Sequence, residues 1–165
     1  IVLDHLREYE GKKFKAVSSA DLKLDEKEKA DDDKDLKKDA DNFAGYLKTI
    51  YGEKVADVKV SERLVDSPCI LVSQAEGPSV QMEKMMKMMN KDYAYAKRVF
   101  EINQNNDLIK ELIRIHQKDP ASEELKTLSN QLLDNMMLRE GVIDNIDTII
   151  PQIQDIMLKA SRNIQ

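Results

Sequence analysis

Several residue types are scarce in this 165-residue chain, and each scarcity excludes a class of protein. A single cysteine, Cys69, excludes a framework of internal disulfides and suits a reducing compartment. Tryptophan is absent, and five glycines with four prolines are too few for a low-complexity chain. No apolar run approaches the roughly 20 residues that cross a bilayer, and we expect no signal peptide. We therefore expect a cytoplasmic protein that has no membrane partner.

Positive charge is also in short supply. The 26 Lys and Arg residues against 31 Asp and Glu give a net charge of −5, which excludes a strongly basic nucleic-acid binder. Residues 21–41 hold ten of the acids and six lysines, so most of the negative charge is local. Asp31, Asp32 and Asp33 lack the spacing of a calcium loop, so this stretch is interpreted as the solvated face of a helix.

Hydrophobic periodicity and capping residues predict the order of elements. Residues 1–8 are expected to end a helix, and 13–17 to form a short strand. A helix over 25–51, strands over 55–60 and 69–72, a helix over 79–90, a strand over 98–102 and three further helices are expected to follow. The apolar run 69–72 is predicted to be a central strand buried on both faces. Partly segregated strands and helices predict an α+β domain with a small three-stranded sheet.

Helix boundaries follow from particular residues. Ser79, Ser122 and either Asn106 or Asp107 are expected to cap the helices that they precede. Gly141 is expected to end the penultimate helix. Pro151 fits the last helix only if that helix begins near residue 147, because proline is tolerated in the first turn.

Residues that could carry catalysis are few. His5 and His116 are far apart in the sequence, and His116 is expected at the rim of an apolar stripe. Cys69 lies in an apolar strand with no Lys or Arg within three residues, which favours a buried, inert thiol over a nucleophile. No metal-ligand, nucleophile-elbow or phosphate-loop motif is present. We expect a chain that is not an enzyme and that holds no metal or cofactor.

Methionine is concentrated in one short segment, since five of the eight methionines fall between residues 82 and 89. Met82, Met85, Met86 and Met89 share one face of a helix, and the opposite face carries Lys84, Lys87 and Lys91. Flexible thioethers are typical of surfaces that adapt to many partners. From the pattern alone, an exposed binding surface, a core helix and a membrane-surface helix all stay open.

The last two helices are expected to form an antiparallel hairpin, because a short glycine-containing link joins them. Both carry apolar residues beside their main stripe, which favours pairing with a second copy into a four-helix bundle. The alternative is that both helices pack onto the sheet of their own chain.

Several strings, in order along the chain, resemble the C-terminal domain of HtpG-type chaperones, the bacterial members of the heat shock protein 90 family. Residues 6–14 (LREYEGKKF) resemble the junction that enters this domain, and 61–69 (SERLVDSPC) resemble its S-x-R-L-x-x-S-P-C turn. Residues 81–84 (QMEK) resemble the opening of its short amphipathic helix. Residues 100–103 (FEIN), together with 108–110 (LIK), resemble its E-I-N-P-x-H-P-L-I-K segment. Residues 132–134 (LLD) resemble the start of the motif in its penultimate helix. The chain departs from the family at Gln104, Asn106 and Asp107, which affects the local turn.

The resemblance implies a homodimer held together by the last two helices and client proteins bound by the amphipathic helix. It implies a dimer interface at Leu125, Leu128, Leu132, Leu133, Met136, Ile149, Ile150, Ile153 and Met157. It implies client binding by Met82, Met85, Met86 and Met89. Residues 1–17 would be the junction from a missing middle domain and 18–165 the dimerisation domain, with ATP bound in an N-terminal domain outside the chain.

The resemblance therefore predicts a homodimerisation domain of an ATP-dependent chaperone that acts in protein folding and the stress response. A generic α+β oligomerisation or adaptor module, with the methionine-rich helix in its core, is the alternative. An enzyme that uses Cys69 or His116 is a third and weaker hypothesis.

Overall fold

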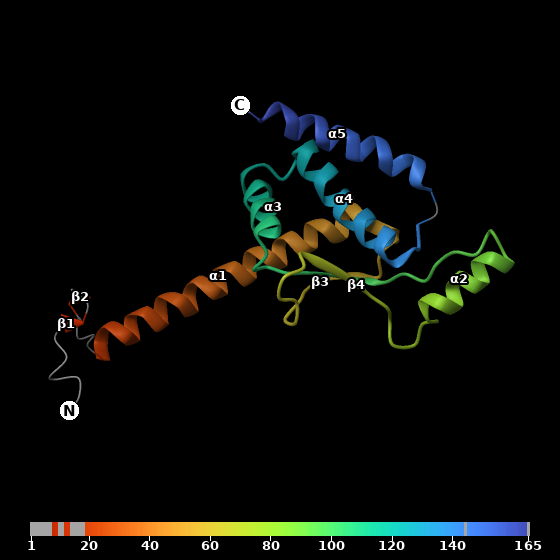
Figure 1. The fold of residues 1–165 in the computed structure, drawn as a ribbon. Coiled ribbons are helices and arrows are strands. Elements are labelled where there is room, and N and C mark those ends of the chain that lie inside the picture. The colour runs from red at the N-terminus through yellow and green to blue at the C-terminus, as the bar shows by residue number, and fades with distance from the viewer. Residues whose placement is uncertain (1–7, 10–11, 14–18, 144, 165) are drawn as a thin grey trace. The chain divides into compact units, whose positions relative to one another are not determined.

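The computed structural model describes residues 8–9, 12–13, 19–143 and 145–164 (Figure 1). The chain divides into two compact units, Ile1–Leu36 and Lys37–Gln165. In the first unit, strands β1 (Glu8–Tyr9) and β2 (Lys12–Lys13) pair antiparallel. The helix end predicted at 1–8 and the strand predicted at 13–17 lie outside the described residues, apart from Glu8 in β1 and Lys13 in β2.

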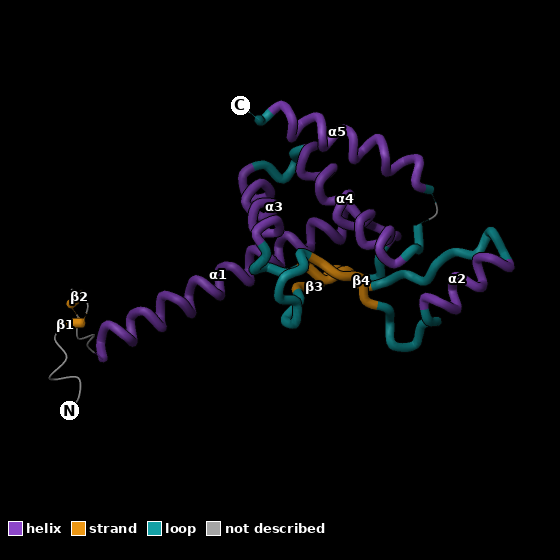
Figure 2. Tube along the Cα trace, viewed as in Figure 1, coloured by secondary structure: helices purple, strands orange, loops and turns teal. Residues whose placement is uncertain are grey.

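The predicted order of elements from residue 19 onward is confirmed, but the predicted start of the first long helix at residue 25 is wrong, because that helix begins at Ser19. Helix α1 (Ser19–Tyr51) is followed by a 3-10 turn (Gly52–Lys54), strands β3 (Asp57–Val60) and β4 (Cys69–Val72), helix α2 (Val80–Met89) and strand β5 (Val99–Ile102). Helices α3 (Asp107–Lys118) and α4 (Glu123–Glu140), a second 3-10 turn (Ile146–Thr148) and helix α5 (Ile149–Arg162) complete the chain. Figure 2 shows the three strands of the second unit gathered in one place, with helices around them, so the α+β prediction is confirmed.

Each predicted cap has its expected geometry. The side chains of Ser79, Asn106 and Ser122 accept hydrogen bonds from backbone N–H groups in the first turns of α2, α3 and α4. Gly141 ends α4 with a φ of 68°, a left-handed conformation that glycine adopts without steric cost. Pro151 lies in the first turn of α5, where its missing N–H leaves no helical bond unmade.

The sheet of the second unit is mixed and has the order β3-β5-β4. Strand β5 runs parallel to β3, with Val58 opposite Phe100, and antiparallel to β4, with Leu71 opposite Phe100. The prediction that 69–72 is the central strand is wrong, because β4 is an edge strand and β5 is central. The apolar run in β4 arises because Cys69 and Leu71 are buried against the helices while the opposite face of β4 is half-buried.

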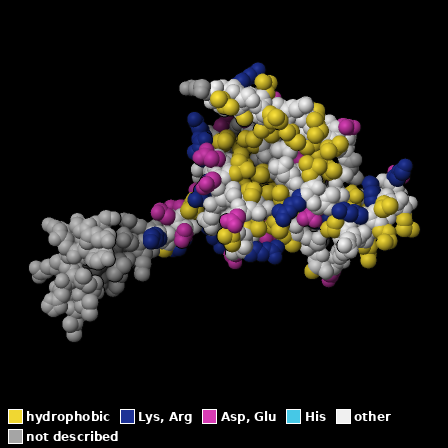
Figure 3. Space-filling view, viewed as in Figure 1, with side chains coloured by type: hydrophobic (Ala, Val, Ile, Leu, Met, Phe, Trp, Pro, Cys, Tyr) yellow, Lys and Arg dark blue, Asp and Glu magenta, His cyan; other side chains and the backbone are white. Residues whose placement is uncertain are grey.

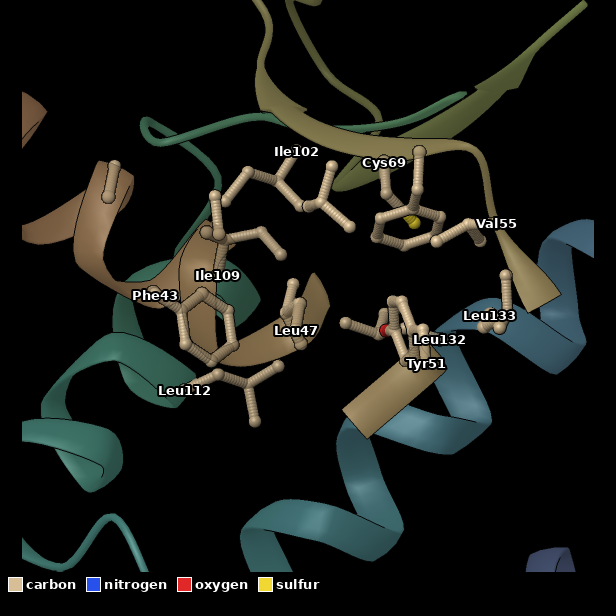
Figure 4. Packing of buried hydrophobic residues seen from close by; sticks show 14 of the residues in the cluster. Phe43, Leu47, Tyr51, Val55, Cys69, Ile102, Ile109, Leu112, Leu132 and Leu133 are labelled. Carbon is tan, nitrogen blue, oxygen red and sulfur yellow. The ribbon is translucent and has the colours of Figure 1, made fainter. Parts of the chain in front are cut away.

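The core lies between the sheet and three helices. Figure 4 shows the sheet on one side and α1, α3 and α4 on the other, with side chains from all of them meeting. Tyr51 joins these layers, because its hydroxyl donates a hydrogen bond to the Ser129 carbonyl of α4 at 2.5 Å. The Tyr51 ring also packs edge-on against the Phe100 ring, with the ring centres 5.2 Å apart. Helix α5 packs against α4 (Figure 1).

A polar clamp fixes the turn between β3 and β4. The Asn103 side chain is buried and donates hydrogen bonds to the carbonyls of Val65 and Ser67, both at 3.1 Å. Asn106 donates to the Asp66 carbonyl at 2.9 Å while its own side-chain oxygen caps α3. Asn106 thus both holds the turn and caps α3, in a segment where the chain departs from the pattern of the family that it resembles.

Candidate functional site

Helix α2 presents its methionines to solvent. Met82, Met85, Met86, Met88 and Met89 are all exposed, from 42% at Met86 to 86% at Met88. In the space-filling view, apolar side chains gather over α2 at the lower right of the molecule (Figure 3). The alternative that this helix belongs to the core of an adaptor module is therefore wrong for this chain.

The side of α2 that faces the chain is polar. Among its ten residues only Glu83 is buried, with none of its surface exposed, and Val80 and Lys87 are half-buried on the same side. Lys87 lies on the side opposite the methionines, as predicted, but it is half-buried. Its ammonium donates a hydrogen bond to the Tyr93 carbonyl at 2.9 Å and lies 5.6 Å from the centre of the Tyr95 ring.

Glu83 forms a buried ion pair with Arg98, the residue before β5. The Arg98 guanidinium is only 5% exposed and donates to the Glu83 carboxylate. The same carboxylate accepts the Ala96 N–H at 2.5 Å, and Arg98 donates to the Ala96 carbonyl at 3.1 Å. A buried charge needs such a partner, because its desolvation is otherwise uncompensated.

Lys84 brings α2 close to the end of α4. Its ammonium nitrogen lies 2.8 Å from the position that a Cβ atom on Gly141 would occupy. The last carbonyls of a helix carry partial negative charge, so a cation is favourable there. The methionine-rich helix therefore adjoins the corner where α4 turns toward α5.

The hairpin residues predicted as an interface divide into three groups by burial. The chain itself buries four of them, which lie in its own core or against it: Leu125, Leu132, Leu133 and Ile149. Leu128, Met136 and Ile153 are half-buried, and only Ile150 and Met157 are exposed. The four buried residues stabilise the single chain and offer no free surface to a second copy.

Helix α5 has an exposed apolar face, and only some of its residues were among those predicted to form an interface. Leu158 is 49% exposed and joins Ile150 and Met157 in this group. Beside it, a groove of about 300 Å³ lies between α4 and α5, lined by Leu128, Ile156 and the aliphatic part of Lys159, among others. The side-chain amide of Gln152 fixes the hairpin by donating to Gln131 at 2.9 Å and to Asp134 at 3.1 Å.

The two residues suspected of reactivity are placed in unreactive surroundings. Cys69 is fully buried, and burial raises the pKa of its thiol to about 12, so the thiol stays protonated at neutral pH. The His116 ring packs against two aromatic rings, with its centre 4.8 Å from that of Tyr46 and 5.7 Å from that of Phe43. Burial lowers the pKa of His116, which favours a neutral ring, as expected for a histidine at the rim of an apolar cluster.

Two further absences concern the part of the chain that the structure describes. No group of three or more His, Cys, Asp or Glu side chains there is arranged to hold a metal ion. No helix in the same part is both long and apolar enough to cross a membrane.

Comparisons with known proteins agree with the resemblance noted in the sequence. The family model described as Hsp90 protein matches residues 1–164. The chain belongs to the Hsp90 family. The chaperone protein HtpG of Buchnera aphidicola is 30% identical over 96% of the chain, and that of Psychromonas ingrahamii is 33% identical over 95%. The endoplasmin homolog of Arabidopsis thaliana is 35% identical over 86% of it.

The match is to only a part of each relative. The chain spans about a quarter of the length of the HtpG relatives, because the aligned region is 25% of each of these two proteins. Two of the Hsp90-type strings, 61–69 and 100–103, are neighbours in space, because the Asn103 side chain donates hydrogen bonds to the turn that precedes Cys69. The methionine-rich helix and the hairpin of this Hsp90 domain are therefore set on one scaffold of sheet and helices.

Proposed function

We propose that this chain is the homodimerisation domain of an Hsp90-type chaperone and that the methionine face of α2 binds unfolded client proteins. The observation that carries the proposal is the exposure of all five methionines of α2 on a helix whose only buried side chain is Glu83. A soluble domain gains nothing for its own stability from apolar side chains left in water. Such a surface is typical of a binding site.

Methionine suits a client surface for a physical reason. Its unbranched side chain has three rotatable bonds and a polarisable sulfur, so one face can fit many apolar shapes. Unfolded proteins present varied apolar segments rather than one fixed surface. The face formed by Met82, Met85, Met86 and Met89, with Met88 beside it, meets that need.

Dimerisation is assigned to the outward face of the α4–α5 hairpin. Ile150, Met157 and Leu158 are exposed on α5, and Leu128 borders the groove between the two helices. Two such hairpins packed around a two-fold axis would form a four-helix bundle and cover these side chains. Leu125, Leu132, Leu133 and Ile149 would support that surface from the core.

The proposal gives the chain a mechanical role. The hairpin would hold two protomers together, and α2 would offer apolar contact to a client near that joint. Hydrolysis of ATP is assigned to a part of the parent chaperone that this chain does not cover. A cytoplasmic location, with no nucleic-acid or membrane partner, is part of the same proposal and suits the reduced, buried Cys69.

The client surface is tested by replacing Met85 and Met86 with serine. We expect the double variant to unfold at the same temperature as the original chain and to lose most of its ability to suppress aggregation of heat-denatured citrate synthase. Replacing Val65 by serine is the matched control, because it removes an exposed apolar side chain that lies outside α2 and outside the α4–α5 hairpin, so client capture should be unchanged. Equal suppression by the original chain and the α2 variant would refute the client surface.

A further inference from the structure

The way in which α2 is attached to the chain is unusual for an amphipathic helix. Such helices normally dock through their apolar face and leave the polar face in water. Helix α2 does the reverse, because its methionines are exposed and its fully buried side chain is a carboxylate, Glu83. What holds this helix in place must therefore be mainly polar.

The partner of that carboxylate is fixed firmly. Arg98 directly precedes β5, the central strand, which is paired with β3 on one side and β4 on the other. Its guanidinium is held in place by the Ala96 carbonyl as well as by Glu83, and it is 5% exposed. The segment that leads into a strand paired on both sides thus presents a buried cation to one particular residue of α2.

Register decides which face of α2 points outward. Glu83 and Lys87 are four residues apart, so the ion pair and the bond from Lys87 to the Tyr93 carbonyl anchor the same side of the helix. Met82, Met85, Met86 and Met89 then occupy the remaining surface. If α2 rotated to bury its methionines, Glu83 and Arg98 would lose each other as partners.

We propose that Glu83 and Arg98 are the positioning pair that seats α2 against the segment leading into β5 and keeps its methionine face outward. The role of the methionine face in client binding rests on the proposed function, whereas the attachment of α2 by the ion pair does not. Removal of one partner leaves an uncompensated buried charge. The chain can relieve this by releasing α2, since no other side chain of the helix is fully buried.

The experiment compares three variants of this chain. Glu83→Gln and Arg98→Met each break the pair, while Glu83→Leu with Arg98→Met replaces it by apolar groups of similar size, an exchange that buried ion pairs often tolerate. The matched control is Glu101→Gln, which breaks the exposed pair between Arg63 and Glu101, 3.3 Å apart, on the same strand β5. Hydrogen exchange of the amides of α2, β5 and α4 reports the seating.

A spin label provides a second readout. Met88→Cys places the label at an 86% exposed site, and the buried Cys69 thiol, with a pKa of about 12, does not compete for labelling. In both single variants we expect α2 amides to exchange at least tenfold faster and the label to become more mobile, with β5 and α4 unchanged. The apolar double variant should return the exchange of α2 and the mobility of the label to the values of the original chain. Glu101→Gln should change neither of them.

Two results would overturn the positioning role. One is unchanged exchange of α2 in both single variants. The other is an equal loss of protection in α2, β5 and α4, which would make the pair a general stabiliser of the fold. Binding of fluorescent carboxymethylated α-lactalbumin is measured in parallel and should weaken several-fold in the single variants and recover in the double variant. Released α2 with unchanged binding would refute the client surface and leave the positioning pair intact.

Discussion

Leu133 and Leu158 are the same residue type on neighbouring helices of one hairpin, but the chain covers them to different extents. Leu133 of α4 is 1% exposed, and Leu158 of α5 is 49% exposed. Replacing Leu133 by alanine leaves a cavity in a closed core, so we expect the free energy of unfolding to fall by about 2–5 kcal/mol. This loss should not depend on protein concentration.

Leu158→Ala should act on assembly instead. Full burial of a leucine side chain contributes about 2 kcal/mol, and roughly half of that remains to be gained when a partner covers Leu158. The loss is about 1 kcal/mol for each subunit and about 2 kcal/mol for a symmetric dimer, which corresponds to a dissociation constant about 30-fold higher. Within a single chain the substitution should cost less than Leu133→Ala.

Sedimentation equilibrium and denaturant unfolding at two protein concentrations separate the two effects. We expect Leu158→Ala to weaken the dimer and Leu133→Ala to lower the unfolding midpoint at both concentrations. Two results would refute the assignment of the interface to the outward face of α5. One is a single-species monomer for the original chain at tens of micromolar, and the other is a Leu158→Ala dimer as tight as the original.

Further predictions concern four single residues. Because burial raises the pKa of Cys69 to about 12, iodoacetamide at pH 8 should label its thiol far more slowly in the native chain than in guanidinium; equal rates would contradict its burial. Burial lowers the pKa of His116 below its unfolded value of about 6.5, so its contribution to stability is complete above that pH and is lost as the pH falls toward the folded pKa. Melting temperatures at pH 7.5 and 5.5 should therefore differ less in His116→Gln than in the original chain, and an identical pH dependence would argue against this. Gly141→Ala should destabilise the chain by about 1–2 kcal/mol, because its φ is 68° and the new Cβ would meet Lys84. Gly45 lies inside α1 with open space around it, so Gly45→Ala should instead stabilise the chain by about 0.5–1 kcal/mol. Denaturant unfolding should therefore give a lower midpoint for Gly141→Ala and a higher one for Gly45→Ala than for the original chain, and equal midpoints would contradict both expectations.

The element order and the capped helix boundaries could be predicted because their causes are local, whereas the start of α1 at Ser19 was not predicted. Ser79 and Ser122 cap helices through N–H groups three residues away, and Gly141 ends α4 through its own backbone conformation. The methionine face also followed from spacing within one helix. Whether that face is buried could not be predicted, because an apolar stripe has the same periodicity in a core and on a binding surface.

The sequence by itself determined the α+β class, the elements and their caps, and the family, since these depend on local chemistry and on motifs along the chain. Only the tertiary structure decided that β5 rather than β4 is central, because four apolar residues in a row do not reveal which strands lie beside them. Only it separated the buried Leu133 from the exposed Leu158. It alone paired Glu83 with Arg98, fifteen residues further along, because the burial of a carboxylate depends on a partner that the fold brings to it.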